Sequence, residues 1–397
     1  MGERKLESYE GADSNRLYRD CFKVIATTKE LQATNSKGLL VAGFYSSIYL
    51  AALAGIFFIP VNEEMIYLSY GLKTVLAVLA GLCLVTFQGI SHDCGHQAFF
   101  KSKFLNNFFG TVFGLPLLVS FRAWTDDHLA HHGKTNVIEE DPNCVFMYTE
   151  EGMEKVQKRL KNPLYFLYFW FFSIMAAIQM GLVASHLFGP PLGKGTTLYW
   201  SKQRALLSLA NLVLIAGFVG TVVYFAPMEF LIFGFLIPNL VFQKLFLMVG
   251  YLEHNQGPAK YYVKGQGNFL KGALESNNFD YGFIFNSFFA GLGIRHLEHH
   301  LFPNIPFYNL NKVQDHLTEE FREEIKDKIE PRRISLFREF YGDYSKNYTL
   351  VPAKDGDHYE KVYRFGEHKH YLFFLVTAVL FPLVLAAKIM AARRAES

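Results

Sequence analysis

His128-Leu129-Ala130-His131-His132 and His296-Leu297-Glu298-His299-His300 are two copies of the spacing HxxHH, and His92-Asp93-Cys94-Gly95-His96 is an HxxxH word that follows an apolar run. At 3.6 residues per turn, positions i, i+3 and i+4 lie on one face of a helix. With 14 histidines in 397 residues, a random chain would contain about 0.02 HxxHH words. The spacing therefore indicates imidazoles clustered on helices rather than a chance pattern.

The eight histidines of these words are candidate metal ligands, and His254, at the end of a later apolar run, is a ninth. Eight imidazoles could supply two ions with four ligands each, and all-nitrogen sites suit iron, copper, nickel and zinc. Because a structural zinc closes at four ligands and commonly includes cysteine, a pair of irons able to activate O2 is the better match. The outer ring nitrogen of each ligand needs a hydrogen-bond partner. Nearby carboxylates that could serve are Asp93, Asp126, Asp127, Glu253, Asp280 and Glu298.

Other readings apply to histidines taken singly. One HxxxH word, or His254 by itself, is also compatible with interfacial or structural histidines, and only the repeated words favour metal. Cys94 is interpreted as a small packing residue and Trp124 as an anchor at the membrane interface. The histidines outside the words are interpreted as surface or interfacial residues: His186, His316, His358, His368 and His370.

The composition indicates a membrane protein. The chain is 51% hydrophobic and 19% charged, against about 25% charged in soluble proteins. A net charge of +3 is too small to suggest a nucleic-acid partner. The four cysteines have no CxxC or disulfide-framework spacing, which suits a reducing compartment. Residues 1–38 are polar, so we expect no cleavable leader.

Four apolar runs have the length of about 20 residues that crosses a hydrocarbon core. They are residues 39–60, 66–90, 205–225 and 229–251, which form two hairpins with short turns. Lys73 and Lys244 interrupt two of the runs, and we expect each to snorkel or to face the protein interior. Lys and Arg are concentrated between the hairpins, from Lys101 to Arg204. This pattern predicts that the middle region and the active site lie on the cytosolic face.

The predicted fold is an all-α integral membrane protein with four transmembrane helices in two hairpins, in-plane helices and a cytosolic cap that holds a di-metal site. All three histidine words meet on one face only if residues 104–121 and 164–188 are in-plane or re-entrant helices. We expect an interfacial anchor near 371–389. The predicted divisions are a cytosolic segment 1–38, a membrane domain 39–310 and a cytosolic C-terminal segment 311–397.

At these words the chain resembles the membrane fatty acid desaturase superfamily, and the HxxxH and two HxxHH words are similar to its three histidine boxes. The stretches 251–254, 272–274, 280–282 and 301–310 also fit the family. The resemblance implies a four-span helical body and a cap with two irons. Gly250 stands where some members have an Asn that helps to hold a metal-bound water. The metal-ligand role is implied for His92, His96, His128, His131, His132, His254, His296, His299 and His300.

The resemblance also implies that O2 is a co-substrate, that the substrate is a membrane lipid or other acyl compound, and that iron is the cofactor. The sequence has no His-Pro-Gly-Gly haem motif, so we expect electrons from a separate carrier of the ferredoxin or cytochrome b5 type. The leading hypothesis is a fatty acid desaturase. Alternatives are a di-iron hydroxylase or ketolase acting on another lipid such as a carotenoid, and a zinc-dependent membrane hydrolase or metal-binding receptor.

Overall fold

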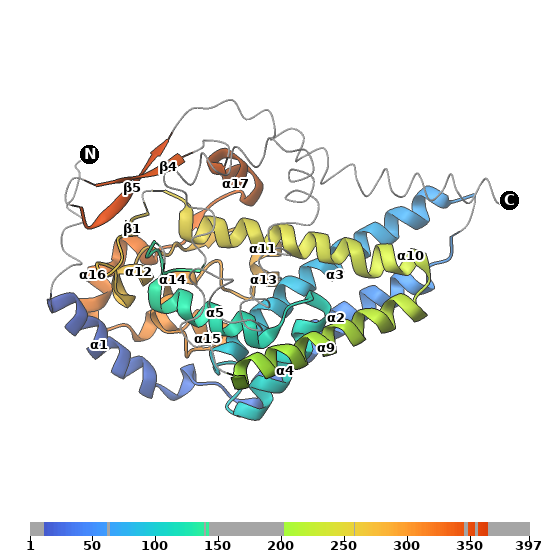
Figure 1. The fold of residues 1–397 in the computed structure, drawn as a ribbon, viewed down its shortest axis with the longest axis horizontal. Helices are drawn as coiled ribbons and strands as arrows, with labels where there is room; N and C mark the ends of the chain where they lie inside the picture. The colour runs from blue at the N-terminus through green and yellow to red at the C-terminus, as the bar shows by residue number, and fades with distance from the viewer. Residues whose placement is uncertain are drawn as a thin grey trace.

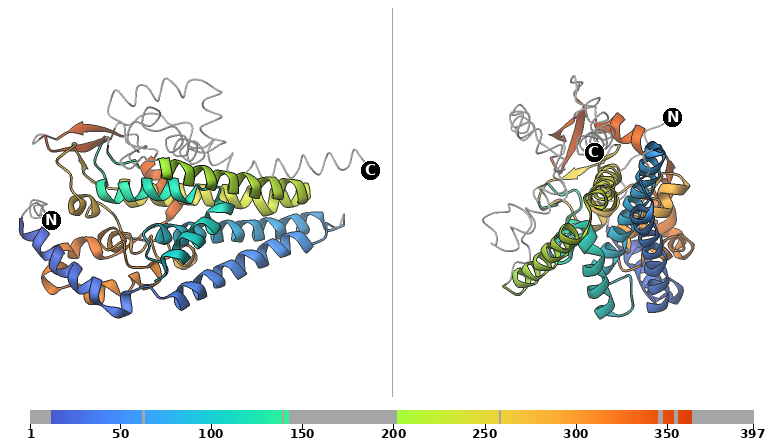
Figure 2. Two further views of the ribbon diagram at one scale, coloured as in Figure 1. Left: turned by 60° about the horizontal axis from the view of Figure 1, so that its bottom comes forward. Right: turned by 90° about the vertical axis from the view of Figure 1, so that its right-hand side faces the viewer.

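A computed structural model of the chain describes residues 12–61, 64–138, 140–142, 202–257, 259–344, 348–353 and 356–363. Its long helices are α2 (Asn35–Phe58), α3 (Ile66–Gly95), α9 (Lys202–Phe225) and α11 (Ile237–Asn255). Two short elements, α10 (Met228–Phe230) and the π-helical turn η5 (Leu231–Leu236), lead directly into α11. In Figures 1 and 2 the long helices run side by side, and the shorter elements gather at one end of them.

The shorter elements are mostly helical. Before and between the long helices lie α1 (Ala12–Thr27), η2 (Lys29–Leu31), α4 (Lys103–Leu117) and α5 (Phe121–Lys134). After α11 come α12 (Phe269–Ala273), α13 (Phe283–Phe288), α14 (His296–Leu301), α15 (Phe307–Leu310), η6 (Val313–His316), α16 (Glu319–Ile329) and α17 (Leu336–Tyr344). The strands are β1 (Tyr261–Tyr262), β2 (Phe279–Asp280), β3 (Arg332–Arg333), β4 (Tyr348–Pro352) and β5 (His358–Tyr363).

The strands are a feature that the all-α prediction did not include. β1, β5 and β4 form an antiparallel sheet, and β2 pairs with β3 in parallel. Two-residue strands are too short to show an alternating apolar pattern, which is the sequence signal for a strand. The pairing of β1 with β5 and of β2 with β3 joins segments far apart in the sequence, so it arises from tertiary packing, whereas β4 and β5 are neighbours in the sequence.

The four predicted apolar runs form helices that are long and apolar enough to cross a membrane, namely Lys29–Phe58, Ile66–Gly95, Ala205–Phe225 and Met228–Asn255. The structure thus contains the four long apolar helices of the predicted membrane body. The helix α3 is the central one, with 72% of its most apolar stretch buried, whereas 6% is buried in α9. The helix α9 therefore lies at the edge of the bundle, where it packs against α4 and α5.

Close contacts explain how α3 reaches the centre. Gly81 has no side chain, and a Cβ there would lie 2.6 Å from Val241 Cβ on α11.

The two lysines that interrupt the apolar runs are both at least half-buried. On α3, the ammonium of Lys73 lies 2.7 Å from Glu229 Oε1 in α10, and Lys73 is buried. Of the two placements expected for Lys73, the structure shows the interior one. The other lysine, Lys244, is half-buried.

Residues 104–121, predicted to be in-plane or re-entrant, form α4 and the turn into α5. The two helices are bent by 103° at this turn, as in a broken span or a re-entrant loop. Leu118 at the turn has a φ of +59°, a left-handed conformation that ends α4. The predicted helices near 164–188 and 371–389 lie outside the described residues.

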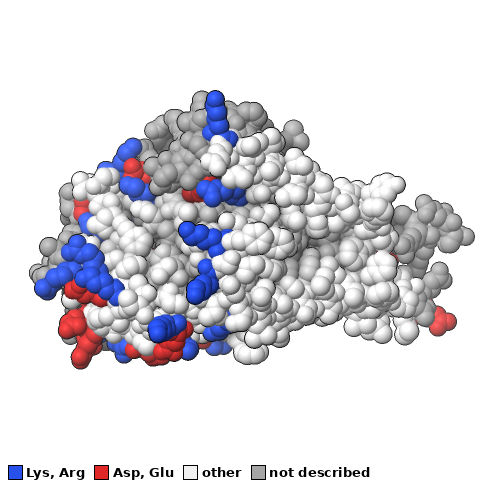
Figure 3. Space-filling model, turned by 90° about the horizontal axis from the view of Figure 1, so that it is seen from below, with Lys and Arg blue, Asp and Glu red and all other residues white. Residues whose placement is uncertain are grey.

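The end of the molecule that carries the short elements is the charged end. Figure 3 shows Lys, Arg, Asp and Glu side chains gathered over it, while the face of the long helices is almost uncharged. Residues beyond 310 belong to this end, because Gln314 Nε2 donates to Glu298 Oε1 at 2.6 Å and Gln256 Nε2 donates to Glu339 Oε2 at 2.8 Å. The described residues 311–344 therefore pack against the segments that carry the third histidine word and His254.

Candidate metal centre

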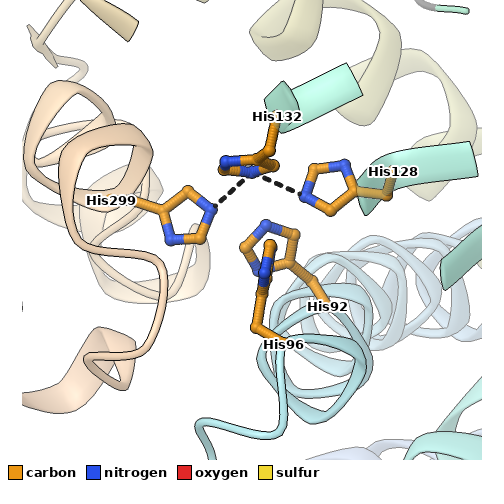
Figure 4. Close-up of side chains that lie close together, drawn as sticks. All are labelled: His92, His96, His128, His132 and His299. Carbon is orange, nitrogen blue, oxygen red and sulfur yellow. Dashed lines mark hydrogen bonds between the residues drawn. The ribbon is translucent and has the colours of Figure 1, made fainter. Parts of the chain in front are cut away.

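Five of the candidate histidines form a first cluster. His92 is in the last turn of α3 and His96 ends that helix, while His128 and His132 come from α5 and His299 from α14. One ring nitrogen of each lies within 4.8 Å of those of the others. Figure 4 shows the five rings arranged around one point, with the two α3 histidines on one side. The i, i+4 spacing on α3 and α5 places both members of each pair on one helix face.

A second cluster lies beside the first. It contains His131, His254 and His300, whose ligand atoms also lie within 4.8 Å of one another. His296 joins it, because its Nε2 lies 2.9 Å from His254 Nε2. The rings of His132 and His300 stack at 4.1 Å between centroids, so the two clusters are in direct contact.

The histidine words are shared between the clusters. His128 and His132 belong to the first cluster and His131 to the second. In the third word the division is reversed, with His299 in the first cluster and His296 and His300 in the second. Neighbouring residues on a helix point about 100° apart, so a single turn of α5 can serve two ions. The nine histidines are thus grouped differently from four imidazoles for each ion, because five surround one point and three, with His296 beside them, surround the other.

The arrangement in the first cluster suits a cation. His132 Nε2 lies 3.0 Å from His128 Nε2 and 3.1 Å from His299 Nε2. A ring nitrogen carries either one proton or one lone pair, so these three atoms cannot all be satisfied by hydrogen bonds to one another. A metal ion accepts a lone pair from each, and bonds of about 2.1 Å would place the nitrogens about 3–4 Å apart.

Buried ring nitrogens without partners give the same indication. His96 Nε2 and His300 Nε2 are buried and make no hydrogen bond in the described part of the chain. In the second cluster, His254 Nε2 lies 3.3 Å from His131 Nε2 and 2.9 Å from His296 Nε2, and one nitrogen with one proton or one lone pair cannot satisfy both. Because unpaired buried polar atoms are costly, the donor set fits metal ions in both clusters.

Burial also keeps these imidazoles in the form that binds metal. Desolvation lowers the pKa of His96, His299 and His300 well below the ordinary histidine value, and neighbouring histidines add to the effect. A neutral imidazole has the free lone pair that a metal needs. These three rings are therefore neutral at physiological pH.

Carboxylates contact the outer nitrogens of three histidines. Asp93 Oδ1 accepts from His92 Nδ1 at 2.9 Å, and Asp141 Oδ1 accepts from His131 Nδ1 at 2.8 Å. The Nδ1 of His296 lies 3.1 Å from Glu253 Oε2, although this contact is not aligned as a hydrogen bond. Such partners fix the tautomer and orientation of a metal-binding histidine.

The predicted set of carboxylate partners was right only in part. Asp93 and Glu253 contact candidate ligands. Asp126 instead binds Arg122, and Asp280 binds Arg333. Asp127 is buried on α5, and Glu298 accepts from Asn278 and Gln314. Asp141 was missed because it lies nine residues after His132, in a loop with no periodic pattern that relates it to the ligand helix.

Trp124 does not lie where its sequence context predicts. It is buried rather than an interface anchor, and its ring stacks on His128 with centroids 4.5 Å apart and planes 11° apart. The i, i+4 spacing of Trp124 and His128 on α5 was the available signal. At Gly250, a Cβ would meet no atom within 4 Å, so this position has space for a side chain.

Histidines assigned to the surface lie away from both clusters where they are described. His316 is half-buried, and its Nε2 lies 2.7 Å from Glu30 Oε1. His358 is buried rather than at the surface, so that prediction was wrong, and its Nδ1 lies 2.5 Å from Asp357 Oδ1. Cys94 is buried in the main core, in agreement with a packing role. His186, His368 and His370 lie outside the described residues.

Gly272 begins the stretch 272–274, and the packing around it explains why a residue without a side chain stands there. A Cβ at Gly272 would lie 2.6 Å from the carbonyl oxygen of Thr135, so α12 packs directly on the end of α5. Thr135 in turn donates its hydroxyl to the His131 carbonyl at 2.8 Å and lies 3.4 Å from His300 Nδ1. The glycine therefore allows the segment next to the second cluster to approach.

Comparison with known proteins agrees with this geometry. An sn-1 acyl-lipid omega-3 desaturase (ferredoxin) of Synechocystis sp. is 28% identical over 308 residues, which are 76% of this chain and 78% of the relative. A protein of the same name from Nostoc sp. is 29% identical over 233 residues, 57% of this chain and 62% of the relative. A Delta(12)-fatty-acid desaturase of Vernicia fordii is 26% identical over 313 residues, 76% of this chain and 79% of the relative.

A match to a protein family covers the segments that carry the histidines of both clusters. Residues 69–326, well over half of the chain, match the family described as fatty acid desaturase. This range contains all three histidine words and His254. The protein therefore belongs to the fatty acid desaturase family.

Proposed function

We propose that the protein is an O2-dependent di-iron desaturase that introduces a double bond into the fatty acyl chain of a membrane lipid. The observation that carries this proposal is the convergence of nine histidines, from three words and α11, on two adjoining points in a chain of this family. Relatives named as acyl-lipid desaturases support a lipid-bound acyl chain as the substrate. They lend no support to a carotenoid hydroxylase or ketolase.

We assign the nine histidines to two irons. The first iron takes His92, His96, His128, His132 and His299, and the second takes His131, His254, His296 and His300. Imidazole suits iron, and none of the three described cysteines is a ligand candidate, because all three lie outside both clusters. The nine rings would thus bind both ions without a protein carboxylate in contact with the metal.

The irons would supply an oxidant, made from O2 and two external electrons, that removes hydrogen from a methylene group, because no side-chain base can take such a proton. In the balanced reaction, two adjacent carbons each lose one hydrogen, and O2 with two electrons and two protons becomes two waters. The protein holds the imidazoles neutral, orients them through carboxylates and surrounds them with buried side chains. Exclusion of water protects the acyl chain from side reactions.

The electrons come from a separate carrier of the ferredoxin or cytochrome b5 type. The relatives from Synechocystis and Nostoc carry the word ferredoxin in their names, which supports the ferredoxin class. We place the active site on the cytosolic face, because the basic residues between the hairpins favour that side. Its position next to the charged end of the molecule supports the assignment.

We retain residues 39–310 as the membrane domain that carries the catalytic site. The segment 1–38 contributes α1 and η2, and the segment 311–397 contributes α16 and α17. Both flank the site directly, since Tyr18 donates its hydroxyl to the Leu301 carbonyl at 2.9 Å, and Gln314 binds Glu298. The two segments would therefore stabilise the position of α14.

Lipid analysis of a host that lacks polyunsaturated lipids would test the proposal. Cells expressing the protein with an electron donor should contain acyl chains with a new double bond, and cells expressing His299→Ala should not. The variant must be present in the membrane fraction in equal amount. A new oxygenated lipid with unchanged acyl chains would favour a hydroxylase instead, and turnover by zinc-loaded, iron-free protein without O2 would contradict both.

A further inference from the structure

Asp93 and Asp141 have equivalent positions in the two clusters. Each carboxylate uses one oxygen for the outer nitrogen of a histidine and the other for a backbone amide. Asp93 Oδ1 accepts from His92 Nδ1 at 2.9 Å, and its Oδ2 accepts from the amide of Phe307 at 2.6 Å. Asp141 Oδ1 accepts from His131 Nδ1 at 2.8 Å, and its Oδ2 accepts from the amide of Asn136 at 2.8 Å.

Each amide belongs to a segment that connects to another part of the site. Phe307 begins α15, seven residues after His300, so Asp93 links the first histidine word to the segment that follows the third. Asn136 has a φ of +59°, its carbonyl accepts from Tyr262, and its side chain donates to the Lys260 carbonyl at 3.2 Å. Asp141 therefore links the second word to the segment that follows His254.

We infer that Asp93 and Asp141 are positioning residues, Asp93 for the first metal through His92 and Asp141 for the second metal through His131. This inference rests on the metal assignment of the proposed function. Asp93 has no exposed surface and Asp141 is buried, so both hydrogen bonds are shielded from water and strong. A carboxylate on Nδ1 holds the proton there, turns Nε2 toward the metal and makes that nitrogen a better ligand.

The chemistry of the contact requires two acceptors, which only a carboxylate offers. His92 Nδ1–H and the Phe307 amide both donate, and the same holds for His131 and Asn136 at Asp141. In Asp93→Asn or Asp141→Asn, the amide oxygen can serve one donor, while the NH2 group would face the other. The variant therefore keeps the shape of the side chain and loses one hydrogen bond.

The experiment is a Co2+ titration of the purified, iron-depleted protein, followed by visible absorption, with iron content per chain measured in parallel. Wild type should bind two ions. Asp93→Asn and Asp141→Asn should each keep one site at wild-type affinity and weaken the other about 10- to 100-fold. The bands that are lost should differ between the two variants. Asp280→Asn is the matched control, because that carboxylate binds Arg333 and Asn286 and no candidate ligand.

A second pair of variants separates positioning from a general effect on folding. If Asp93 acts through His92, then Asp93→Asn should cause no further loss of Co2+ affinity in a His92→Ala background. A further loss there, or two sites of wild-type affinity in both single variants, would overturn the inference. Equal weakening of both sites by either variant would overturn the assignment of one carboxylate to each metal. Wild type that binds no Co2+ and no iron would instead contradict the proposed function itself.

Discussion

His254 differs from the other candidate ligands because it stands outside the repeated words. It is the single histidine of α11, and its Nε2 lies 3.3 Å from that of His131 and 2.9 Å from that of His296. In the sequence it is one histidine at the end of an apolar run, which is also typical of a structural residue. Its place among the second cluster depends on packing between α11, α5 and α14.

We expect His254→Ala to lower iron content as much as His131→Ala does, because both rings face the same point of the second cluster. Turnover should be lost in both variants, while the first cluster keeps its ion. Iron per chain in purified protein measures this, with His316→Ala as control since that ring binds Glu30 away from the site. A His254→Ala protein with two irons would remove His254 from the ligand set.

Trp124 shows what a single-residue reading can miss. A tryptophan near an apolar run usually marks the membrane interface, which is the position predicted for Trp124. Its parallel stacking on His128 fills the space next to the first cluster instead. The result follows from helix geometry, since residues four apart on α5 share a face, but the ring orientation depends on the neighbouring helices.

At the scale of the helical elements, the glycines of α3 test how closely it packs. A Cβ at Gly81 would meet Val241 at 2.6 Å and the Pro238 carbonyl at 2.9 Å, whereas a Cβ at Gly71 on the same helix would meet no atom within 4 Å. Gly81→Ala should destabilise the protein by about 1–3 kcal/mol through overpacking. Gly71→Ala should be neutral or stabilising by up to about 1 kcal/mol.

Thermal unfolding of the two purified variants in one detergent would measure this difference. Because Gly81 and Gly71 share α3, general effects on helix propensity cancel in the comparison. Equal unfolding temperatures for both variants would mean that α3 and α11 do not pack as closely as the structure shows. A lower value for Gly71→Ala alone would contradict the open space at that position.

The ion pair between Lys73 and Glu229 joins α3 to the start of α10 inside an apolar part of the molecule. Removal of one partner of a buried pair is strongly destabilising, whereas replacement of both by apolar residues can be neutral. We expect Lys73→Met to lower stability by about 3 kcal/mol, with the double variant Lys73→Met/Glu229→Leu close to wild type. Unfolding of both variants measures this, and a double variant less stable than Lys73→Met would contradict a simple ion pair.

At the scale of the whole molecule, the charged end and the turns of the hairpins should lie on opposite sides of the membrane. Glu64, in the turn before α3, and Lys264, in the loop after β1, are both exposed. In vesicles with the cytosolic face outward, a membrane-impermeant thiol reagent should label Lys264→Cys at once and Glu64→Cys only after permeabilisation. Each variant is compared with the parent protein to account for native cysteines.

Labelling of both positions from the same side would contradict the two-hairpin arrangement. Labelling of Glu64→Cys alone from the cytosolic face would invert the proposed orientation and leave the hairpins intact. The test needs no enzymatic activity, so it addresses the membrane arrangement separately from the chemistry. It also decides on which side an electron carrier must bind.

Much of this protein could be predicted from local sequence patterns. Apolar runs of membrane-spanning length predicted α2, α3, α9 and α11, because run length is a property of consecutive residues. The spacing of the histidine words predicted shared helix faces for the same reason. The resemblance to the desaturase superfamily rests on these words and agrees with the family match over residues 69–326.

Contacts between separate elements, by contrast, could not be predicted from local sequence patterns. The division of each HxxHH word between two clusters, the pairing of His131 with Asp141, the stacking of Trp124 on His128 and the short strands all depend on contacts between separate elements. Spacing along one helix determines which side chains share a face. It contains no information about the rotation and distance of a second helix, which close packing at residues such as Gly81 and Gly272 sets.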